Sequence, residues 1–293
     1  MTYASVPRGR QGYPPLLTEL HDPPARLHLR GGSPGVLARP AVAVVGARSC
    51  SAYGAQVARE LAQSLAAAGV VIVSGLARGV DAEAHRGALA AGGLTVAVLG
   101  CGIDRDYPRA HAELARRIAE QGIVVSEYPP GVEPSPWRFP ARNRIIAGLA
   151  RATVVVEARE RSGALITADF ALELGREVFA VPGEITSALS AGTNDLLRQG
   201  AAPLLSADDV FESLGLEPLA PVVPDDLSSH ARAVLERLSD GARTLDELVR
   251  ATEIGTAAMA AVLTELELAG LIAVADGVYR RATGRGPPRV VRS

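Results

Sequence analysis

The sequence contains no lysine, so all thirty of its basic residues are arginine. A Walker-A phosphate clamp, a Schiff base and a pyridoxal site each need a lysine amine, so these three classes of site are excluded. The thirty arginines stand against 32 acidic residues, which gives a formal net charge of −2. A surface that attracts nucleic acid must therefore be local rather than spread over the whole molecule.

Cysteine, histidine and aromatic residues are also scarce. Cys50 and Cys101 have no CxxC partner or neighbouring base in the sequence, so we expect neither to be catalytic or redox-active. The five histidines show no tight spacing with cysteines or carboxylates, so we expect no metal site. Aromatic residues make up 4% of a chain that is 48% hydrophobic, which predicts an aliphatic core.

Long apolar runs are absent as well. No run approaches the roughly 18 residues of a membrane-spanning helix, and the first residues lack the apolar core of a signal peptide. We therefore expect a cytoplasmic protein that makes no contact with a membrane.

Short β-branched runs alternate with Ala- and Leu-rich amphipathic segments from residue 41 onward. The runs predict strands at 41–45, 70–74, 94–99, 123–126, 153–157, 177–181 and, more weakly, 202–205, and helices at 55–68, 81–91 and 111–120. Short apolar strands that alternate with helices are typical of a parallel sheet covered on both faces. The sequence therefore predicts an α/β fold with a Rossmann-like, doubly wound parallel sheet over residues 41–215.

Four further segments flank this domain. Residues 1–40 are rich in proline and glycine without a clear period, and we expect an N-terminal extension that packs on the α/β domain. Residues 216–227 hold three prolines, which indicates a linker. Helical patterns at 228–238 and 256–269, a capping box at Thr244 and Glu247, and two β-prone runs around Asp276-Gly277 predict a small winged helix over 228–281. The arginine-rich residues 282–293 are predicted to form a disordered basic tail.

Glycine-rich turns come after the first two predicted strands. In an open α/β sheet, ligands bind beyond the carboxyl ends of the strands, and a glycine there lets backbone amides approach an anion. The first turn holds Gly46 and Arg48, and the second holds Gly75, Arg78 and Gly79. We expect these turns to line a phosphate-binding groove. The GxGxxG fingerprint is absent and no acid ends the second strand, so we expect no NAD and no other cofactor.

The segment after the fourth strand carries aromatic rings interleaved with arginines, and we expect a loop of about fourteen residues, long enough to mark a functional loop. Rings can stack on bases and guanidinium groups can pair with phosphates, which is what single-stranded nucleic acid requires. The alternative is that the ring of Trp137 or of Phe139 packs the loop onto the sheet and does not contact a base. The residues expected to contact DNA are Phe139, Arg142, Asn143 and Arg144.

The turn after the fifth strand contains Ser162 and Gly163 at the start of a predicted helix, with Thr167 one turn later. Ser-Gly at a helix start is a seat for an anion. We find no nucleophile, base and orienting partner at a recognisable spacing, which predicts binding rather than catalysis. Several carboxylates near strand ends are expected to cap helices or pair with arginines: Asp81, Asp104, Glu127 and Glu157.

With these residues assembled, the chain resembles the DNA-processing protein A (DprA, also called Smf) family. Seven segments carry the resemblance, in order, from about Tyr13 to Leu214: VVGARSCSAYG, VSGLARGVDAEAH, VLGCGIDRDYP, SEYPPG, FPARNRIIAGLA, SGALITADFALELGREVFAVPG and GTNDLLRQGA. The resemblance implies a homodimeric single-stranded-DNA-binding protein that protects incoming DNA and loads RecA recombinase during natural transformation. It also implies a positive DNA-binding pocket that includes Arg48, Phe139, Arg142, Asn143, Ser162, Gly163 and Thr167.

Two features depart from the family pattern. Ala47 stands where serine is common, which is a mild change, and we expect the helical N-terminal domain of many relatives to be missing or truncated here. The alternative to a DNA binder is a phosphoribohydrolase, because such enzymes share this Rossmann variant and resemble one another in a PGGxGTxxE segment with a catalytic glutamate. Here Ala168 and Asp169 come after Thr167 without a matching glutamate, which favours binding over hydrolysis.

The predicted winged helix is acidic. Residues 225–280 hold ten acids and five arginines, and the expected recognition helix carries Glu265 and Glu267 but no basic residue. Reading of bases in the major groove favours arginine, asparagine or glutamine on that helix. We therefore expect a docking or regulatory module, to which the basic tail could add weak, salt-sensitive attraction for DNA.

Overall fold

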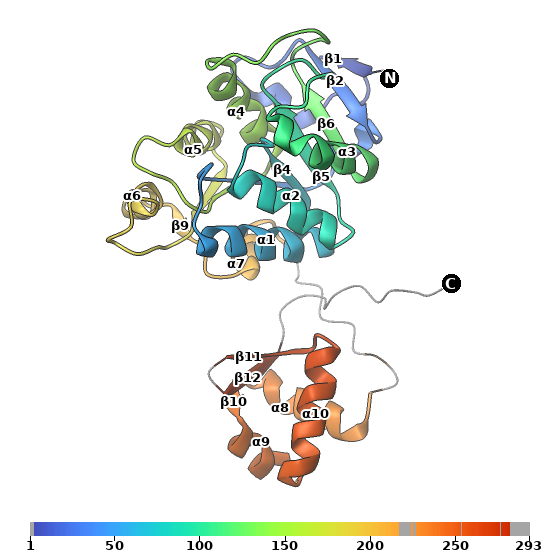
Figure 1. The fold of residues 1–293 in the computed structure, drawn as a ribbon, viewed down its shortest axis with the longest axis vertical. Coiled ribbons are helices and arrows are strands. Elements are labelled where there is room, and N and C mark those ends of the chain that lie inside the picture. Colours follow the sequence, from blue (N-terminus) through green and yellow to red (C-terminus); the bar gives the residue numbers. More distant parts are fainter. Residues whose placement is uncertain (1–2, 217–223, 225–226, 253, 276, 282–293) are drawn as a thin grey trace. The chain divides into compact units, whose positions relative to one another are not determined.

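The computed structural model describes residues 3–216, 224, 227–252, 254–275 and 277–281, and the chain divides into two compact units, Met1–Glu217 and Pro218–Ser293 (Figure 1). The predicted tail at 282–293 and most of the predicted linker at 216–227 lie outside the described residues. None of the helices within the described ranges is long and apolar enough to cross a lipid bilayer.

A nine-stranded sheet forms the centre of the first unit, in the order β1-β2-β6-β5-β4-β3-β7-β8-β9. Neighbours from β6 to β9 pair in parallel, which confirms the predicted α/β class. The sequence reading missed the antiparallel pair β1 and β2, which lies within the segment taken as an extension and adds an edge to the sheet. The strands are β1 (Ala4–Pro7), β2 (Arg26–Gly31), β3 (Ala41–Val45), β4 (Val71–Ser74), β5 (Thr95–Leu99), β6 (Ile123–Ser126), β7 (Ala152–Val155), β8 (Glu177–Ala180) and β9 (Ala202–Pro203).

Helices cover both faces of this sheet (Figure 1). On one face lie α1 (Ala52–Ala67), α2 (Val80–Ala90), α3 (Ala112–Gln121) and α7 (Ala207–Ser213), which bury aliphatic residues against the strands. On the other face lie α4 (Arg138–Leu149), α5 (Gly163–Glu173) and α6 (Ala191–Arg198). The short 3-10 helix η1 (Pro15–Glu19) of the N-terminal segment packs beside α4.

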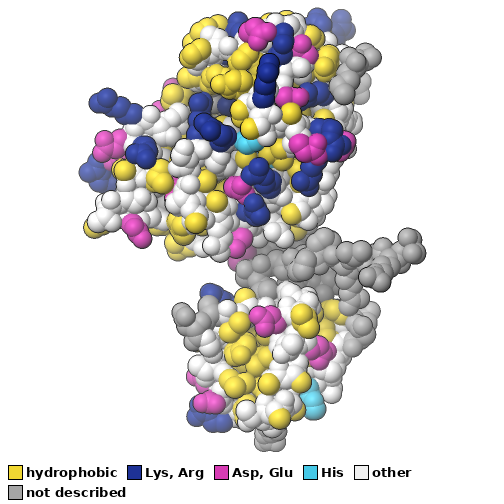
Figure 2. All heavy atoms as spheres, in the orientation of Figure 1, with side chains coloured by type: hydrophobic (Ala, Val, Ile, Leu, Met, Phe, Trp, Pro, Cys, Tyr) yellow, Lys and Arg dark blue, Asp and Glu magenta, His cyan; other side chains and the backbone are white. Residues whose placement is uncertain are grey.

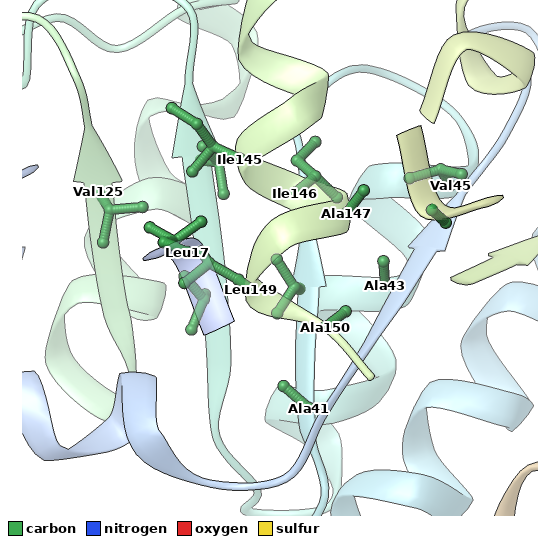
Figure 3. Packing of buried hydrophobic residues seen from close by; sticks show 14 of the residues in the cluster. Leu17, Ala41, Ala43, Val45, Val125, Ile145, Ile146, Ala147, Leu149 and Ala150 are labelled. Carbon is green, nitrogen blue, oxygen red and sulfur yellow. The ribbon is translucent and has the colours of Figure 1, made fainter. Parts of the chain in front are cut away.

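Helix α4 shows how the aliphatic core holds this layer in place. Its Ile145, Ile146 and Leu149 are almost fully buried in one cluster with Leu17 of η1 and with Ala41 and Ala43 of β3 (Figure 3). Full burial of one such side chain contributes about 1.5–3 kcal/mol. Small alanines on the strand let the larger helix residues approach closely, so α4 is held against the middle strands of the sheet, β3, β4 and β5.

The strand order reverses between β3 and β7. The chain adds β4, β5 and β6 on one side of β3, and then crosses back through α4 to add β7, β8 and β9 on the other side. The two halves diverge at this point and leave a crevice beyond the carboxyl ends of β3 and β7, which is where ligands bind in open α/β sheets.

The second unit is a winged helix, as predicted. The Ser228 hydroxyl caps its first helix by accepting from the Ala231 amide at 3.1 Å. The Thr244 amide donates to Glu247 Oε2 at 2.7 Å and the Glu247 amide donates to the Thr244 hydroxyl at 3.4 Å, which together form the expected capping box. The elements are α8 (Ser229–Ser239), β10 (Arg243–Thr244), α9 (Leu245–Thr252), α10 (Thr256–Leu268), β11 (Ile272–Ala275) and β12 (Val278–Arg281).

Candidate nucleic-acid interface

A pocket of about 190 Å³ opens at the crevice between β3 and β7. Its walls come from four segments of the sequence: the turn after β3, the turn after β4 with the start of α2, the first turns of α4, and the start of α5. The predicted site residues that line it are Gly46, Arg48, Phe139, Arg142, Asn143, Ser162, Gly163 and Thr167.

Arg48 supplies an exposed cation at the mouth of this pocket. Its guanidinium carbon lies 5.6 Å from the centroid of the Phe139 ring, a cation–π contact. Within the described ranges Arg48 forms no ion pair with a carboxylate. The turn that carries it is fixed, because the Ala47 amide donates to the Glu157 carbonyl at 2.7 Å and the Val80 amide donates to the Ala47 carbonyl at 3.2 Å. The charge of Arg48 is therefore positioned and available to a ligand.

Helix α4 begins earlier than predicted, so the loop between β6 and α4 is shorter than the expected length of about fourteen residues. The helix starts at Arg138 and holds Pro140 in its first turn, where a proline is tolerated because the amide there has no helical partner. Phe139, Arg142, Asn143 and Ile146 then lie at helical spacing on one face, and all four line the pocket.

Arg142 is buried beneath the pocket rather than exposed at its mouth. Its Nη1 donates to the Gly75 carbonyl at 2.6 Å and also to the Val98 carbonyl, and its Nε donates to Oδ1 of Asn143 at 3.2 Å. Burial lowers the pKa of Arg142 to about 10, so the side chain remains charged at neutral pH. Gly75 is required at its position because a Cβ there would collide with this guanidinium.

The start of α5 supplies backbone donors. Ser162 caps the helix by accepting from the Ala164 amide at 3.3 Å. Nδ2 of Asn143 donates to the Gly163 carbonyl at 2.9 Å and so fixes α5 against α4. A Cβ on Gly163 would meet no atom within 4 Å, so the space before this helix end is open. A helix N-terminus directed into open space beside two arginines suits an anion.

Four predicted site residues do not line the pocket. Arg144 lies off the pocket-facing side of α4, and its Nη2 pairs with Glu127 at 2.6 Å. Arg78 is exposed in the turn after β4 but is not part of the lining. Gly75 and Gly79 do not line the pocket but allow the backbone around it to pack closely. Gly79 has a φ of +72°, and a Cβ there would collide with the Ala47 carbonyl.

The carboxylates near the strand ends cap or pair. Glu157 accepts from the Ser51 amide at 2.8 Å and from the Ser51 hydroxyl at 2.5 Å, at the start of α1. Asp81 accepts from the Ala77 amide at 3.1 Å and is the one carboxylate in the pocket lining. Burial raises the pKa of Asp81, and the nearby charge of Arg142 opposes that shift. The sequence analysis expected Asp81 to cap a helix or pair with an arginine, and did not predict its place in the pocket wall.

The residues that the structure describes contain no group of three His, Cys, Asp or Glu side chains close enough to hold a metal ion.

Two family models match the chain. DNA recombination-mediator protein A matches residues 5–215, and the DprA winged helix domain matches residues 217–277. The chain belongs to the DNA recombination-mediator protein A family. It is 48% identical over 248 residues to a DprA relative from Mycobacterium tuberculosis, an alignment that covers 82% of this chain and 64% of the length of that relative.

Two solved structures agree with this assignment. DNA processing protein A from Streptococcus pneumoniae is 46% identical, with a TM-score of 0.69 over 72% of this chain and 74% of the other. DNA processing protein A from Helicobacter pylori, whose structure concerns its single-stranded DNA binding mode, is 31% identical, with a TM-score of 0.66 over 72% of this chain and 95% of the other. The predicted fold and family are therefore confirmed.

Proposed function

We propose that this protein binds single-stranded DNA in the pocket between β3 and β7. The observation that carries the proposal is the convergence of an unpaired cation, an aromatic ring and an open helix start in one pocket. Arg48 reaches a phosphate as a forked donor, Phe139 supplies an apolar wall, and the start of α5 at Gly163 supplies backbone amides. The Helicobacter pylori relative, described for its single-stranded DNA binding mode, supports the same ligand.

The surface charge favours a small site over a broad one. Arginines are interspersed with acidic side chains on the visible face of the first unit (Figure 2), and the net charge of the chain is −2. Because a duplex is held largely by a wide field of phosphate contacts, a narrow pocket favours a flexible single strand that can turn one nucleotide into it.

We propose that the pocket binds without catalysis. Asp81 is the one carboxylate in its lining, and that carboxylate already accepts a hydrogen bond from the backbone amide of Ala77. Counted from Thr167, the glutamate of the phosphoribohydrolase segment would fall at position 170, where this chain has the half-buried Phe170. Turnover of nucleoside monophosphates by the pure protein would contradict this part of the proposal.

Membership of the family also suggests a role for the protein in the cell. We propose that the protein works in the cytoplasm as a homodimer, protects incoming single strands, and loads RecA recombinase during transformation and recombination. The winged helix is proposed to dock a partner rather than read duplex DNA, because α10 has no basic residue and exposes Glu265, Glu267 and Leu268.

Fluorescence anisotropy with labelled oligo-dT and its duplex tests the proposal. We expect single-strand binding that weakens with salt and exceeds duplex binding. Arg48→Ala should weaken it about 10-fold or more, the effect of losing one charge-assisted phosphate contact. The matched control is Arg151→Ala, because Arg151 is also exposed but directly precedes β7, at the opposite edge of the sheet. Equal affinity for duplex, or equal loss in both variants, would refute the site.

A further inference from the structure

A pair of aromatic rings joins the DNA pocket to a second cleft. Phe139 lines the pocket, and Tyr107, in the loop after β5, lines a cleft of about 410 Å³ together with Arg105, Arg109 and Pro134. The ring centroids of Tyr107 and Phe139 lie 5.2 Å apart, with 26° between the ring planes. The two rings are therefore stacked and form one continuous surface between the pocket and the cleft.

The turn after β5 makes this stack possible. A Cβ on Gly100 would lie 2.8 Å from Cδ1 of Phe139 and 3.3 Å from the Arg138 carbonyl oxygen. A larger residue there would displace the first turn of α4, so glycine lets the Phe139 ring settle against the loop that carries Tyr107. Phe139 is covered in part by Arg48 and Tyr107, whereas Tyr107 is 43% exposed. The ring surface available to a base is therefore on Tyr107.

The second cleft is close to neutral. Arg105 pairs with Glu133 at 2.8 Å, and Asp106 pairs with Arg30 at 2.7 Å. Arg109 is exposed, and the described residues offer it no ion pair. Because most charges here are already paired, this cleft gives little attraction for phosphate, and a ligand would be held mainly by stacking.

We propose that Tyr107 is a second contact for the DNA strand, a base-stacking platform outside the phosphate pocket. A strand whose phosphate lies at Arg48 continues past Phe139 and places a base on the exposed Tyr107 ring. This inference rests on the proposed function. Trp137 is the competing ring, because it is 61% exposed. However, its ring carries the Arg138 guanidinium at 5.0 Å, and it lines neither the pocket nor the cleft.

The test is the length dependence of single-strand affinity, measured by anisotropy on the full chain with oligo-dT of about 3 to about 12 nucleotides. Tyr107→Ala should leave the shortest strands that bind unaffected, and should weaken the longer ones about 5- to 10-fold, as expected for one lost stacking ring. Tyr107→Phe should keep full affinity at every length. The slope of log affinity against log salt should not change in Tyr107→Ala, because no phosphate contact is lost.

Trp137→Ala is the matched control and should match the unmodified protein at every length. Equal affinity of Tyr107→Ala and the unmodified protein at all lengths would overturn the inference, as would a larger loss in Trp137→Ala. A uniform loss at every length would also overturn it, because Tyr107 would then act only by supporting Phe139. If Arg48→Ala loses affinity while Tyr107→Ala does not, the Tyr107 inference fails and the proposed DNA-binding function stands. If the unmodified protein does not bind single strands, both proposals fail.

Discussion

The most specific prediction about the pocket concerns Arg142, which combines a structural role with a proposed role in DNA binding. Replacement by methionine keeps much of the side-chain volume but removes the buried charge. The Gly75 and Val98 carbonyls, at or just beyond the ends of β4 and β5, then lose their donor. Asp81 in the pocket wall also loses the positive neighbour that opposes its raised pKa. We therefore expect Arg142→Met to destabilise the first unit and to weaken DNA binding.

The size of the effect can be worked out from these contacts. A hydrogen bond to a charged group contributes about 1.5–3 kcal/mol, and methionine recovers part of this loss through apolar packing. We expect a net loss of about 2–4 kcal/mol in the free energy of unfolding. For a unit of this size, that corresponds to a fall in Tm of about 5–15 °C.

Intrinsic fluorescence can measure this change in the full chain. The sequence has one tryptophan, Trp137, which lies in the first unit, so its emission reports unfolding of that unit and not of the winged helix. The matched control is Arg144→Met, two positions further along α4. Its guanidinium pairs with Glu127 away from the pocket, so this variant should retain single-strand affinity. Arg142→Met should bind about 10-fold more weakly at a temperature where both variants are folded, as expected for a lost interaction with a charged group.

Two results would refute this reasoning. An unchanged Tm in Arg142→Met would mean that the two carbonyl contacts contribute nothing to the fold. A lower Tm with unchanged DNA affinity would mean that Arg142 only supports the backbone of the strand ends and adds no charge to the binding site.

The pocket wall and the second unit give three further predictions. Burial raises the pKa of Asp81 above 3.8, so its contribution to stability is present below that pH and is lost as the pH rises through the folded-state pKa. Asp81→Asn should flatten this dependence in urea melts and, by removing about 1 kcal/mol of repulsion, tighten single-strand binding about 5-fold. Gly79→Ala should lower the free energy of unfolding by more than about 1 kcal/mol, because its φ is +72° and a Cβ would meet the Ala47 carbonyl. Removal of residues 218–293 should leave the affinity for a short oligo-dT within about 2-fold of the intact chain, because every residue of the pocket precedes them.

The parallel part of the fold could be predicted because its strands are short, apolar and separated by amphipathic helices. Strands β1 and β2 were not predicted, because neither contains an apolar or β-branched run long enough to stand out among the prolines and glycines around it. These two strands join the large sheet through β2, which pairs antiparallel with β6 more than ninety positions later in the chain. Such an edge is fixed by tertiary contact and not by a local pattern.

The site shows the same limit. Gly46 and Arg48 lie in the turn after β3 and Ser162 lies in the turn after β7, so the carboxyl-edge rule brings them together from sequence alone. Arg144 was expected beside Arg142 because the segment was taken as a loop, in which neighbouring side chains can face one ligand. On a helix, residues two apart face different directions, so Arg144 points to Glu127 instead. The Tyr107 ring was missed because its partner Phe139 is distant in sequence and only the fold stacks them.

The most direct test of the central claim is a crystal structure of the full chain with a short oligo-dT. The account predicts a DNA phosphate in the pocket between β3 and β7, with its oxygens about 2.7–3.1 Å from the Arg48 guanidinium and from a backbone amide at the start of α5. A strand bound elsewhere on the protein, with this pocket free of DNA, would contradict it.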